Sequence, residues 1–348
     1  MYACHIYSGF IDIVDFKDKK NPKFLGTVST PGKFPHNSWL NENSKVLFTT
    51  DEIDNSFLTA YDVSDPANIK LLDKVQSNPG SNSVVHNTHI IKVGNGEFAV
   101  TAWYRDGFTI VDVTRPLNMI QVGNYDTHPF SGGGMGGDWG VYPYFPSGTI
   151  VASSIDEGLF VCTPNYTRAC YLEGVVTDSL TGLPINQADV TISGTLIKEK
   201  TLLTGNYATG LPAPGGTYSV TYSAAGYRSK TVSDVLLSSG VVMQKDIQLQ
   251  KSPLSIFENE LNTVNLNAYP NPFTNDIAIV YEFQSKQPEG STIQLTDVLG
   301  KKIQEISITG MQGNISLGPE LNAGIYYVRI VNSKASSNPV KLIKVQAF

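Results

Sequence analysis

The sequence predicts an all-β protein, in which a partial β-propeller of about three blades, N-terminally truncated, is followed by two β-sandwich domains. The first observation is composition: charged residues make up 16% of the 348 residues, and short Val, Ile and Thr runs alternate with turns rich in the 31 Gly and 19 Pro residues. The second is that no long window shows apolar residues at helical spacing. The third is an internal repeat. We expect a propeller fragment, a sandwich, a linker and a second sandwich, at residues 1–164, 170–250, 251–264 and 265–348.

The repeat has a period of about 50 residues. Similar apolar segments occur at Gly9–Phe16, Phe57–Val63, Gly107–Val113 and, in shortened form, Gly158–Thr163. Their equivalent positions are 47, 50 and 51 residues apart, at Asp15, Asp62, Asp112 and Thr163. A propeller blade needs four strands per period, because one four-stranded sheet cannot bury both faces alone. Since the chain opens within a blade and carries only about three blades, we expect further repeats upstream of Met1.

A second series of residues is in phase with the first and precedes a strand in each repeat. It contains His36-Asn37, His86-Asn87 and Gly137-Asp138, with spacings of 50 and 51 residues. A propeller gathers equivalent groups around its axis, so His36, Asn37, His86, Asn87 and Asp138 are candidate ligand-binding residues. Imidazole, amide and carboxylate groups bind cations, calcium among them, or a polar ligand. The alternative is that these side chains satisfy backbone groups at the strand entrances.

The first 250 residues resemble known bacterial domains. The segments Phe10–Asp15 and Phe108–Asp112 resemble LVIVD repeats, and the run into the later domains resembles the choice-of-anchor B family. Strand and turn residues from Leu172 to Leu249 resemble the carboxypeptidase regulatory-like domain, a prealbumin-like sandwich that accompanies enzymes without being one. This resemblance implies a spacer or interaction module. The segment Asp178-Ser179-Leu180 also resembles an acceptor site for O-glycosylation in Bacteroidota envelope proteins, with Ser179 as the acceptor. The alternative is an ordinary turn, in which Asp and Ser are common.

The carboxyl end carries a further resemblance. Prolines flanking Asn271 predict a rigid lead-in rather than part of a ladder, and strands are expected at residues 276–281, 292–295, 303–308, 325–331 and 340–345. The order of motifs resembles the type A sorting domain of type IX secretion cargo, carried by Tyr269, Pro270, Asn271, Pro272, Gly324, Tyr326, Arg329 and Lys341. The resemblance implies export by the type IX machinery, location outside the cell or on the outer-membrane surface, and removal of this domain during export.

Charge and hydropathy exclude several classes of partner. A net charge of −6 and an isoelectric point near 5.4 argue against binding to nucleic acid or an anionic membrane. No apolar run approaches the roughly 20 residues that span a bilayer. The amino end lacks the features of a signal peptide, so for an exported protein we expect missing upstream sequence.

Cysteine and catalytic motifs give little support for an enzyme. The three cysteines contain no C-x-x-C pair, and Cys162 and Cys170 either form a disulfide or are two independent thiols. No nucleophile elbow or zinc-binding helix accompanies the five histidines. We therefore expect a secreted or cell-surface, non-catalytic protein without a cofactor that binds an unidentified glycan or protein. The competing hypothesis is an extracellular enzyme, with a metal bound at His36, His86 and Asp138.

Overall fold

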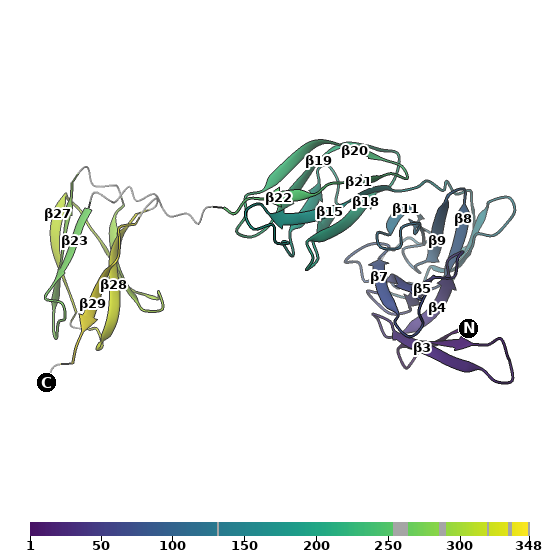
Figure 1. Cartoon of the computed structure of the whole chain (residues 1–348), viewed down its shortest axis with the longest axis horizontal. Helices are drawn as coiled ribbons and strands as arrows, with labels where there is room; N and C mark the ends of the chain where they lie inside the picture. Colours follow the sequence, from purple (N-terminus) through teal and green to yellow (C-terminus); the bar gives the residue numbers. More distant parts are fainter. Residues whose placement is uncertain (131, 253–263, 285–289, 319, 333–335, 347–348) are drawn as a thin grey trace. The chain divides into compact units, whose positions relative to one another are not determined.

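The computed structural model describes residues 1–130, 132–252, 264–284, 290–318, 320–332 and 336–346. These residues form strands and connections, and none of them lies in a helix, which confirms the predicted all-β class. None forms a helix long and apolar enough to cross a membrane. The chain divides into two compact units, Met1–Lys251 and Ser252–Phe348 (Figure 1). Most of the predicted linker, residues 253–263, lies outside the described residues.

The first part of unit one consists of antiparallel sheets in which consecutive strands pair in order (Figure 1). The strands are β1 (Tyr2–His5), β2 (Phe10–Asp15) and β3 (Lys23–Ser29); β4 (Pro35–Leu40), β5 (Val46–Asp51), β6 (Leu58–Asp62) and β7 (Lys70–Val75); β8 (Thr88–Val93), β9 (Gly96–Ala102), β10 (Phe108–Asp112) and β11 (Ile120–Tyr125); and β12 (Asp138–Tyr142), β13 (Ile150–Ser154) and β14 (Gly158–Cys162). The apolar series of the sequence forms β2, β6, β10 and β14, whereas the second series lies at the starts of β4, β8 and β12.

Burial differs along each sheet. The middle strands β5, β6, β9 and β10 are buried along almost their whole length, whereas the last strands β3 and β7 are largely exposed. The buried side chains form clusters between consecutive sheets, for example Phe48 and Leu58 with Trp103. Each such apolar side chain contributes about 1.5–3 kcal/mol through burial. Continuous apolar runs in the sequence therefore mark strands that are covered on both faces.

Residues 170–250 form a two-sheet sandwich, as predicted. Its strands are β15 (Cys170–Asp178), β16 (Asp189–Ile192), β17 (Lys198–Lys200), β18 (Asn206–Leu211), β19 (Gly215–Ser223), β20 (Lys230–Ser238), β21 (Val242–Gln244) and β22 (Ile247–Leu249). One sheet has the order β18-β15-β21, with β22 also paired to β15, and the other has the order β17-β16-β19-β20. A single apolar core joins both sheets, and the hydroxyls of Tyr207 and Tyr222 satisfy each other within it, 2.9 Å apart.

Polar contacts fix this sandwich to the preceding sheets. Arg115, which follows β10, makes a two-point ion pair with Glu173 of β15, at 2.8 Å from Nε and 2.6 Å from Nη2. The buried Asp112 carboxylate accepts hydrogen bonds from Arg168 and from the backbone amide of Ala169, both at 2.8 Å. After β14 the chain thus makes this junction and enters β15, instead of adding a fourth strand to the sheet of β12–β14.

Unit two is a second sandwich. It contains β23 (Val264–Tyr269), β24 (Ile277–Phe283), β25 (Thr292–Asp297), β26 (Lys302–Ser307), β27 (Gln312–Leu317), β28 (Gly324–Val331) and β29 (Val340–Lys344). Two sheets, β23-β24-β27 and β26-β25-β28-β29, enclose one apolar core. The expected strands are present, but β23 and β27 correct the sequence analysis. Each has a small residue, Ala268 or Gly313, at one of its less exposed positions, which weakens the apolar alternation on which a strand prediction depends.

Candidate functional site

The predicted residues of the second series lie close together because the sheets that carry them are neighbours. His36 lies in β4, and His86 directly precedes β8. The first strands β4, β8 and β12 are in contact in that order. The rings of His36 and His86 are stacked with their centres 4.1 Å apart. Two histidines separated by 50 residues in the chain thus form one cluster.

Glu52 completes this cluster and was missed by the sequence analysis. Its side chain lies 3.0 Å from Nδ1 of His36 through Oε2 and 3.6 Å from Nε2 of His86 through Oε1. One ligand atom from each of the three residues lies within 4.8 Å of the other two. Glu52 directly follows β5, the strand paired with β4, so the return of the chain along its neighbour places the carboxylate beside His36. No repeated spacing marks Glu52, because the later repeats have no acidic residue at the corresponding strand end.

Trp139 is the second residue that the sequence analysis did not assign to the site. Its indole N–H donates to Nε2 of His86 at 2.7 Å, and its backbone carbonyl accepts from Nδ1 of the same ring. His86 is therefore held in the Nδ1–H tautomer. Burial lowers the pKa of His86 to about 4, with a further contribution from the neighbouring His36. His86 is thus a neutral imidazole near neutral pH.

Tyr104 supports the cluster from a neighbouring loop. Its hydroxyl donates to Oε1 of Glu52 at 2.6 Å, and its ring centre lies 5.1 Å from that of His86. Burial, and the hydrogen bond to Glu52, raise the pKa of Tyr104, so the phenol remains a donor. The backbone φ of Tyr104 is +45°, an uncommon value for a bulky residue. Strained backbone of this kind persists where the surrounding structure fixes it, and such positions cluster at functional sites.

The structure does not bring the Asp138 carboxylate into this cluster. The strand register pairs Asp138 with Ser154 at the end of β13, which matches the pairing of Pro35 with Asp51 at the end of β5. Trp139, rather than Gly137, therefore occupies the position equivalent to His36, and a β-bulge lies at both. The alignment from sequence was displaced by two residues, since it used a spacing of 51 residues after His86 whereas Trp139 follows His86 by 53 residues.

Asp138 instead lies fully buried. Neither carboxylate oxygen has a hydrogen-bond partner of normal geometry among the described residues. Burial raises the pKa of Asp138 to about 8, opposed only in part by the nearby backbone amide of Ser153. Its own backbone exchanges two hydrogen bonds with Tyr104, at 2.7 and 3.0 Å.

Asn37 and Asn87 each connect one first strand to the next. The side-chain oxygen of Asn37 accepts from the backbone amide of Thr88 at 3.2 Å, and the side-chain amide of Asn87 donates to the carbonyl of Trp139 at 3.4 Å. These contacts correspond to the structural alternative stated for the series, in which polar side chains satisfy backbone groups. Their role in ligand binding stays a prediction.

Aromatic rings lie on β4, the strand that also carries His36, and on β12 and the connection after it. Trp39, Tyr142, Tyr144 and Phe145 form what we call the aromatic patch, with His89 between the rings. Trp39 is 37% exposed and Tyr142 is 45% exposed. The hydroxyl of Tyr144 donates to the carbonyl of Ile90 at 2.9 Å, which fixes that ring. The patch combines rigid aromatic surface with an imidazole, a combination found at binding sites.

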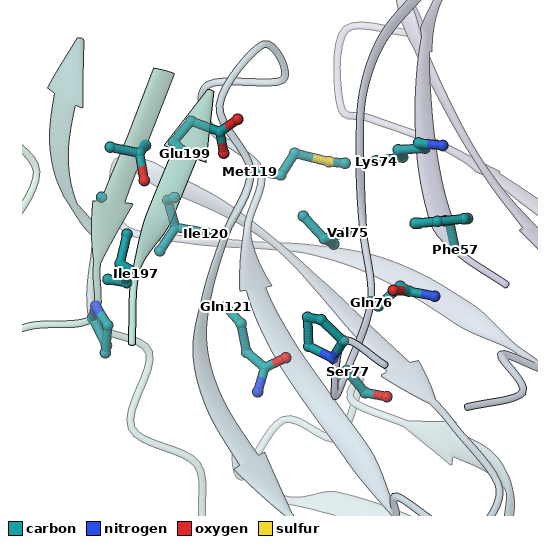
Figure 2. Close-up of a pocket in the computed structure, with 14 residues that line it drawn as sticks. Phe57, Lys74, Val75, Gln76, Ser77, Met119, Ile120, Gln121, Ile197 and Glu199 are labelled. Carbon is teal, nitrogen blue, oxygen red and sulfur yellow. The ribbon is translucent and has the colours of Figure 1, made fainter. Parts of the chain in front are cut away.

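A cavity of about 470 Å³ lies at the junction of the repeat sheets and the first sandwich. Figure 2 shows Ile197 and Glu199 of the sandwich on one side, with Met119 and Val75 of the repeat sheets nearby. Burial raises the pKa of Glu199, as it raises that of Asp73, whose carboxylate accepts from the amide of Met119 at 2.7 Å. The cavity belongs to the packing of this junction and contains no histidine or cysteine among its lining residues.

The cysteines do not form the disulfide that the sequence analysis gave as one of two alternatives. Cys162 and Cys170 are free, like Cys4. Cys170 is buried in the core of the first sandwich, whereas Cys162 lies on β14 in the preceding sheet. Burial raises the pKa of both thiols, as expected for unreactive side chains.

The other predicted positions lie apart from the cluster. Ser179 is exposed directly after β15, where an acceptor serine is accessible. The side chain of His128 is only 8% exposed and is paired with Asp156 at 3.2 Å. The Gly-rich segment Gly132–Gly137 lies in the connection between β11 and β12.

The predicted sorting residues surround β28 and β29 of unit two. The side chain of Asn271 bonds the carbonyl of Lys341 and the amide of Ile343, at 2.6 and 2.9 Å, so the Pro-flanked segment is tied to β29. Arg329 makes two hydrogen bonds to Gln294 on the neighbouring strand β25. Tyr269 ends β23, and Pro270 and Pro272 follow it. Gly324 begins β28, and the hydroxyl of Tyr326 donates to the carbonyl of Asn322.

Chains of solved structure show only distant likeness. A DUF3823 family protein from Bacteroides ovatus is 13% identical, with 50% of this chain and 98% of that chain covered and a TM-score of 0.19. A putative membrane-associated protein from Bacteroides fragilis is 10% identical, with 52% and 97% covered and a TM-score of 0.20. The periplasmic gluconolactonase of Pseudomonas aeruginosa is 11% identical, with 89% and 80% covered and a TM-score of 0.33. No significant match to a curated protein was found.

Two family models match parts of the chain. Residues 171–250 match the carboxypeptidase regulatory-like domain, and residues 267–345 match the secretion system C-terminal sorting domain. Both resemblances seen in the sequence are thereby confirmed. The two matches leave residues 1–170 uncovered, so the LVIVD and choice-of-anchor B resemblances stay predictions. The sorting domain identifies the protein as cargo of type IX secretion, located outside the cell or on the outer-membrane surface.

Proposed function

We propose that the protein is a non-catalytic binding protein of the cell surface, in which residues 1–164 form part of a β-propeller that presents a ligand-binding surface. Residues 170–250 act as a supporting module, residues 251–264 as a linker, and residues 265–348 as the export signal. The aromatic patch is the observation that carries this proposal.

The pattern of strand contacts supports a propeller arrangement. The strand directly before the apolar-series strand of one sheet touches the first strand of the next sheet in three successive cases, β1 with β4, β5 with β8 and β9 with β12. Consecutive sheets with this contact pattern, at a constant period near 50 residues, correspond to neighbouring blades. The first strands then lie innermost, where equivalent side chains converge.

The aromatic patch supports binding rather than simple solvent exposure. Trp and Tyr provide large, rigid contact surfaces at low entropic cost, and they are enriched at interfaces. The patch lies on a protein that is exported and carries few charges, so an extracellular glycan or protein is the fitting class of ligand. Nucleic acid is disfavoured by the net charge of −6.

A binding screen tests this proposal. The full chain is probed against arrays of glycans and extracellular proteins, and any ligand found is titrated against Trp39→Ala. Loss of a central aromatic contact should weaken binding about 30-fold. Tyr7→Ala is the matched control, because Tyr7 is an exposed aromatic residue that contacts Phe34 rather than the patch. Equal affinity of the two variants for every ligand found would place binding elsewhere.

The competing function is a metal-dependent extracellular enzyme. Two histidines and a glutamate are also the ligands of some catalytic zinc sites, which keep a coordination position for water. The distinction is measurable with the same preparation: metal-dependent hydrolysis of peptide, ester or glycoside substrates that is abolished by Glu52→Gln would favour the enzyme.

A further inference from the structure

The donor atoms of His36, Glu52 and His86 converge on one point from two sheets. His36 lies in β4, Glu52 follows β5, and His86 precedes β8. The three donor atoms lie within 4.8 Å of one another. In a tetrahedral zinc site with metal–ligand distances of about 2.0–2.1 Å, the donors are separated by roughly 3.3 Å. The two oxygens of Glu52 each face one ring, with Oε2 at 3.0 Å from Nδ1 of His36 and Oε1 at 3.6 Å from Nε2 of His86.

The types of donor select the class of metal. Two imidazole nitrogens and one carboxylate oxygen suit zinc, cobalt, nickel or copper, whereas calcium and magnesium prefer oxygen ligands alone. Calcium, one of the cations considered from the sequence, therefore fits these residues poorly. The two histidines are the reason, since they provide two of the three donors.

The surrounding residues hold the donors in place. Tyr104 donates to Oε1 of Glu52 and so orients the carboxylate. The carbonyl of Trp139 accepts from Nδ1 of His86, which leaves the lone pair of that ring on Nε2, the atom facing Glu52. Metal-binding histidines almost always donate their second nitrogen to such a carbonyl or carboxylate. The site therefore has the supporting contacts expected around a metal.

One group in the structure competes for the same lone pair. The indole N–H of Trp139 donates to Nε2 of His86 at 2.7 Å. Trp139 is 55% exposed, so its side chain has room to turn toward solvent. A metal bound to Nε2 of His86 replaces the hydrogen bond from the indole. The hydrogen bond from Nδ1 to the carbonyl of Trp139, which fixes the tautomer, is unchanged.

We infer that His36, Glu52 and His86 form a binding site for a divalent transition metal, with zinc as the fitting ion, and that the indole of Trp139 caps the site when it is empty. This inference rests on the geometry of the cluster and not on the identity of any ligand of the aromatic patch. The plain alternative is an ion pair between His36 and Glu52. Two other histidine–carboxylate pairs, His5 with Asp12 and His128 with Asp156, provide an internal comparison because neither has a third donor among the residues that the structure describes.

The test uses the untagged full chain, freed of metal with a chelator. Cobalt(II) is added first, because its visible absorption reports on coordination, and zinc is then added in competition. One equivalent of cobalt should bind, and its visible absorption spectrum should be that of a metal ion with few ligands, as in a tetrahedral site. His36→Ala and Glu52→Gln should each weaken binding at least about 100-fold, and Tyr104→Phe about 10- to 100-fold. Circular dichroism checks that each variant is folded, and Glu52→Gln retains the shape of the side chain.

Two further variants separate a metal site from nonspecific binding. His128→Ala should bind metal as the unmodified protein does. Trp139→Phe removes the competing donor and should tighten binding about 2- to 10-fold, the effect of one neutral hydrogen bond. Absence of stoichiometric binding, or equal weakening in His36→Ala and His128→Ala, would overturn the inference. The readout is metal coordination alone, so its failure leaves the proposed ligand binding unaffected, and the reverse also holds.

Discussion

At the scale of single residues, the entrance of β12 depends on a buried carboxylate and on a special backbone conformation. Asp138 lies at 0% exposure without a hydrogen-bond partner of normal geometry among the described residues. Gly137, directly before it, has a φ of +89°. Each feature leads to a measurable consequence for stability.

Replacing Asp138 with Asn should change how stability depends on pH. Burial raises the pKa of Asp138 from 3.8 to about 8, so between these values the folded protein holds a proton that the unfolded chain has released. The contribution of Asp138 to stability is therefore complete below about pH 4 and is lost as the pH rises toward 8. Asp138→Asn lacks this loss. Between about pH 5 and 8 its free energy of unfolding should therefore fall by at least about 1 kcal/mol less than that of the unmodified protein.

Urea unfolding at several pH values measures this difference. The unmodified protein is the reference at each pH, so that the titration of other groups, including His86, cancels in the comparison. Parallel stability curves for the two proteins would show that Asp138 ionises normally in the folded state.

Gly137→Ala should destabilise the protein more than Gly148→Ala. Both glycines have positive φ, +89° and +76°, and an alanine there costs about 1–2 kcal/mol of strain. A Cβ at Gly137 would in addition lie 2.4 Å from the carbonyl oxygen of Tyr104, whereas one at Gly148 meets nothing within 4 Å. Thermal unfolding should give a difference of at least about 1 kcal/mol between the variants. Equal losses of stability in the two variants would mean that the loop carrying Tyr104 moves away from the new Cβ at little energetic cost.

At the scale of elements, β15 belongs to the sandwich and also anchors the repeat sheets. Glu173 on this strand accepts hydrogen bonds from Arg115 and from Asn118, and the Asn118 side chain also reaches the carbonyl of Thr209 on β18. Tyr171, two residues earlier, is fully buried beneath the Arg115 and Arg168 guanidinium groups. The two folded parts of unit one are thus coupled through one strand.

Glu173→Ala should weaken this coupling. Arg115 and Asn118 would each lose a partner at a partly buried position, with an expected loss of about 1–3 kcal/mol. Calorimetry should then resolve separate unfolding transitions for the repeat sheets and the sandwich. Asp189→Ala breaks exposed ion pairs to Lys198 and Lys200 and should change stability by less than about 1 kcal/mol. A single transition in Glu173→Ala would show that apolar packing alone maintains the junction.

At the scale of the whole molecule, the repeat sheets depend on the sandwich more than the sandwich depends on them. A fragment of residues 1–164 loses Arg168 and Ala169, which satisfy the buried Asp112 carboxylate. It also exposes apolar surface and strand edges. We expect this fragment to associate or aggregate, whereas residues 170–250 and residues 1–251 should remain soluble and fold cooperatively. Light scattering and calorimetry compare the three, and a stable monomeric 1–164 fragment would contradict the proposed propeller.

Export should depend on unit two. Residues 252–348, fused to a reporter with a Sec signal, should carry it to the cell surface of a bacterium with the type IX machinery. Deletion of Val340–Phe348 should leave the reporter in the periplasm, because it removes β29, whose Leu342 lies in the core and whose Ile343 is bonded by Asn271. Lys341→Ala separates recognition from folding, since this side chain is exposed. Equal delivery in a strain without the translocon would refute the dependence on this pathway.

The sequence by itself determined the fold class, the sandwich segments and the route of export. Apolar alternation and turn residues are local properties, so strands such as β2, β6 and β10 can be recognised without knowledge of their partners. The sorting motif is also a short, linear pattern. In unit two β23 and β27 escaped, because each has a small residue, Ala268 or Gly313, at one of its less exposed positions.

The tertiary structure alone decided which side chains form the site. His36 and His86 share a repeated position, and the sequence placed them together. Glu52 joined them because β5 returns beside β4, and Trp139 took the place expected of Gly137-Asp138 because the pairing of β12 with β13 differs by two residues from the sequence alignment. Convergence of groups 50 residues apart depends on strand register and on the packing of neighbouring sheets. Neither quantity is encoded in local periodicity, since a shift of one residue changes which side chains face the site while the composition stays the same.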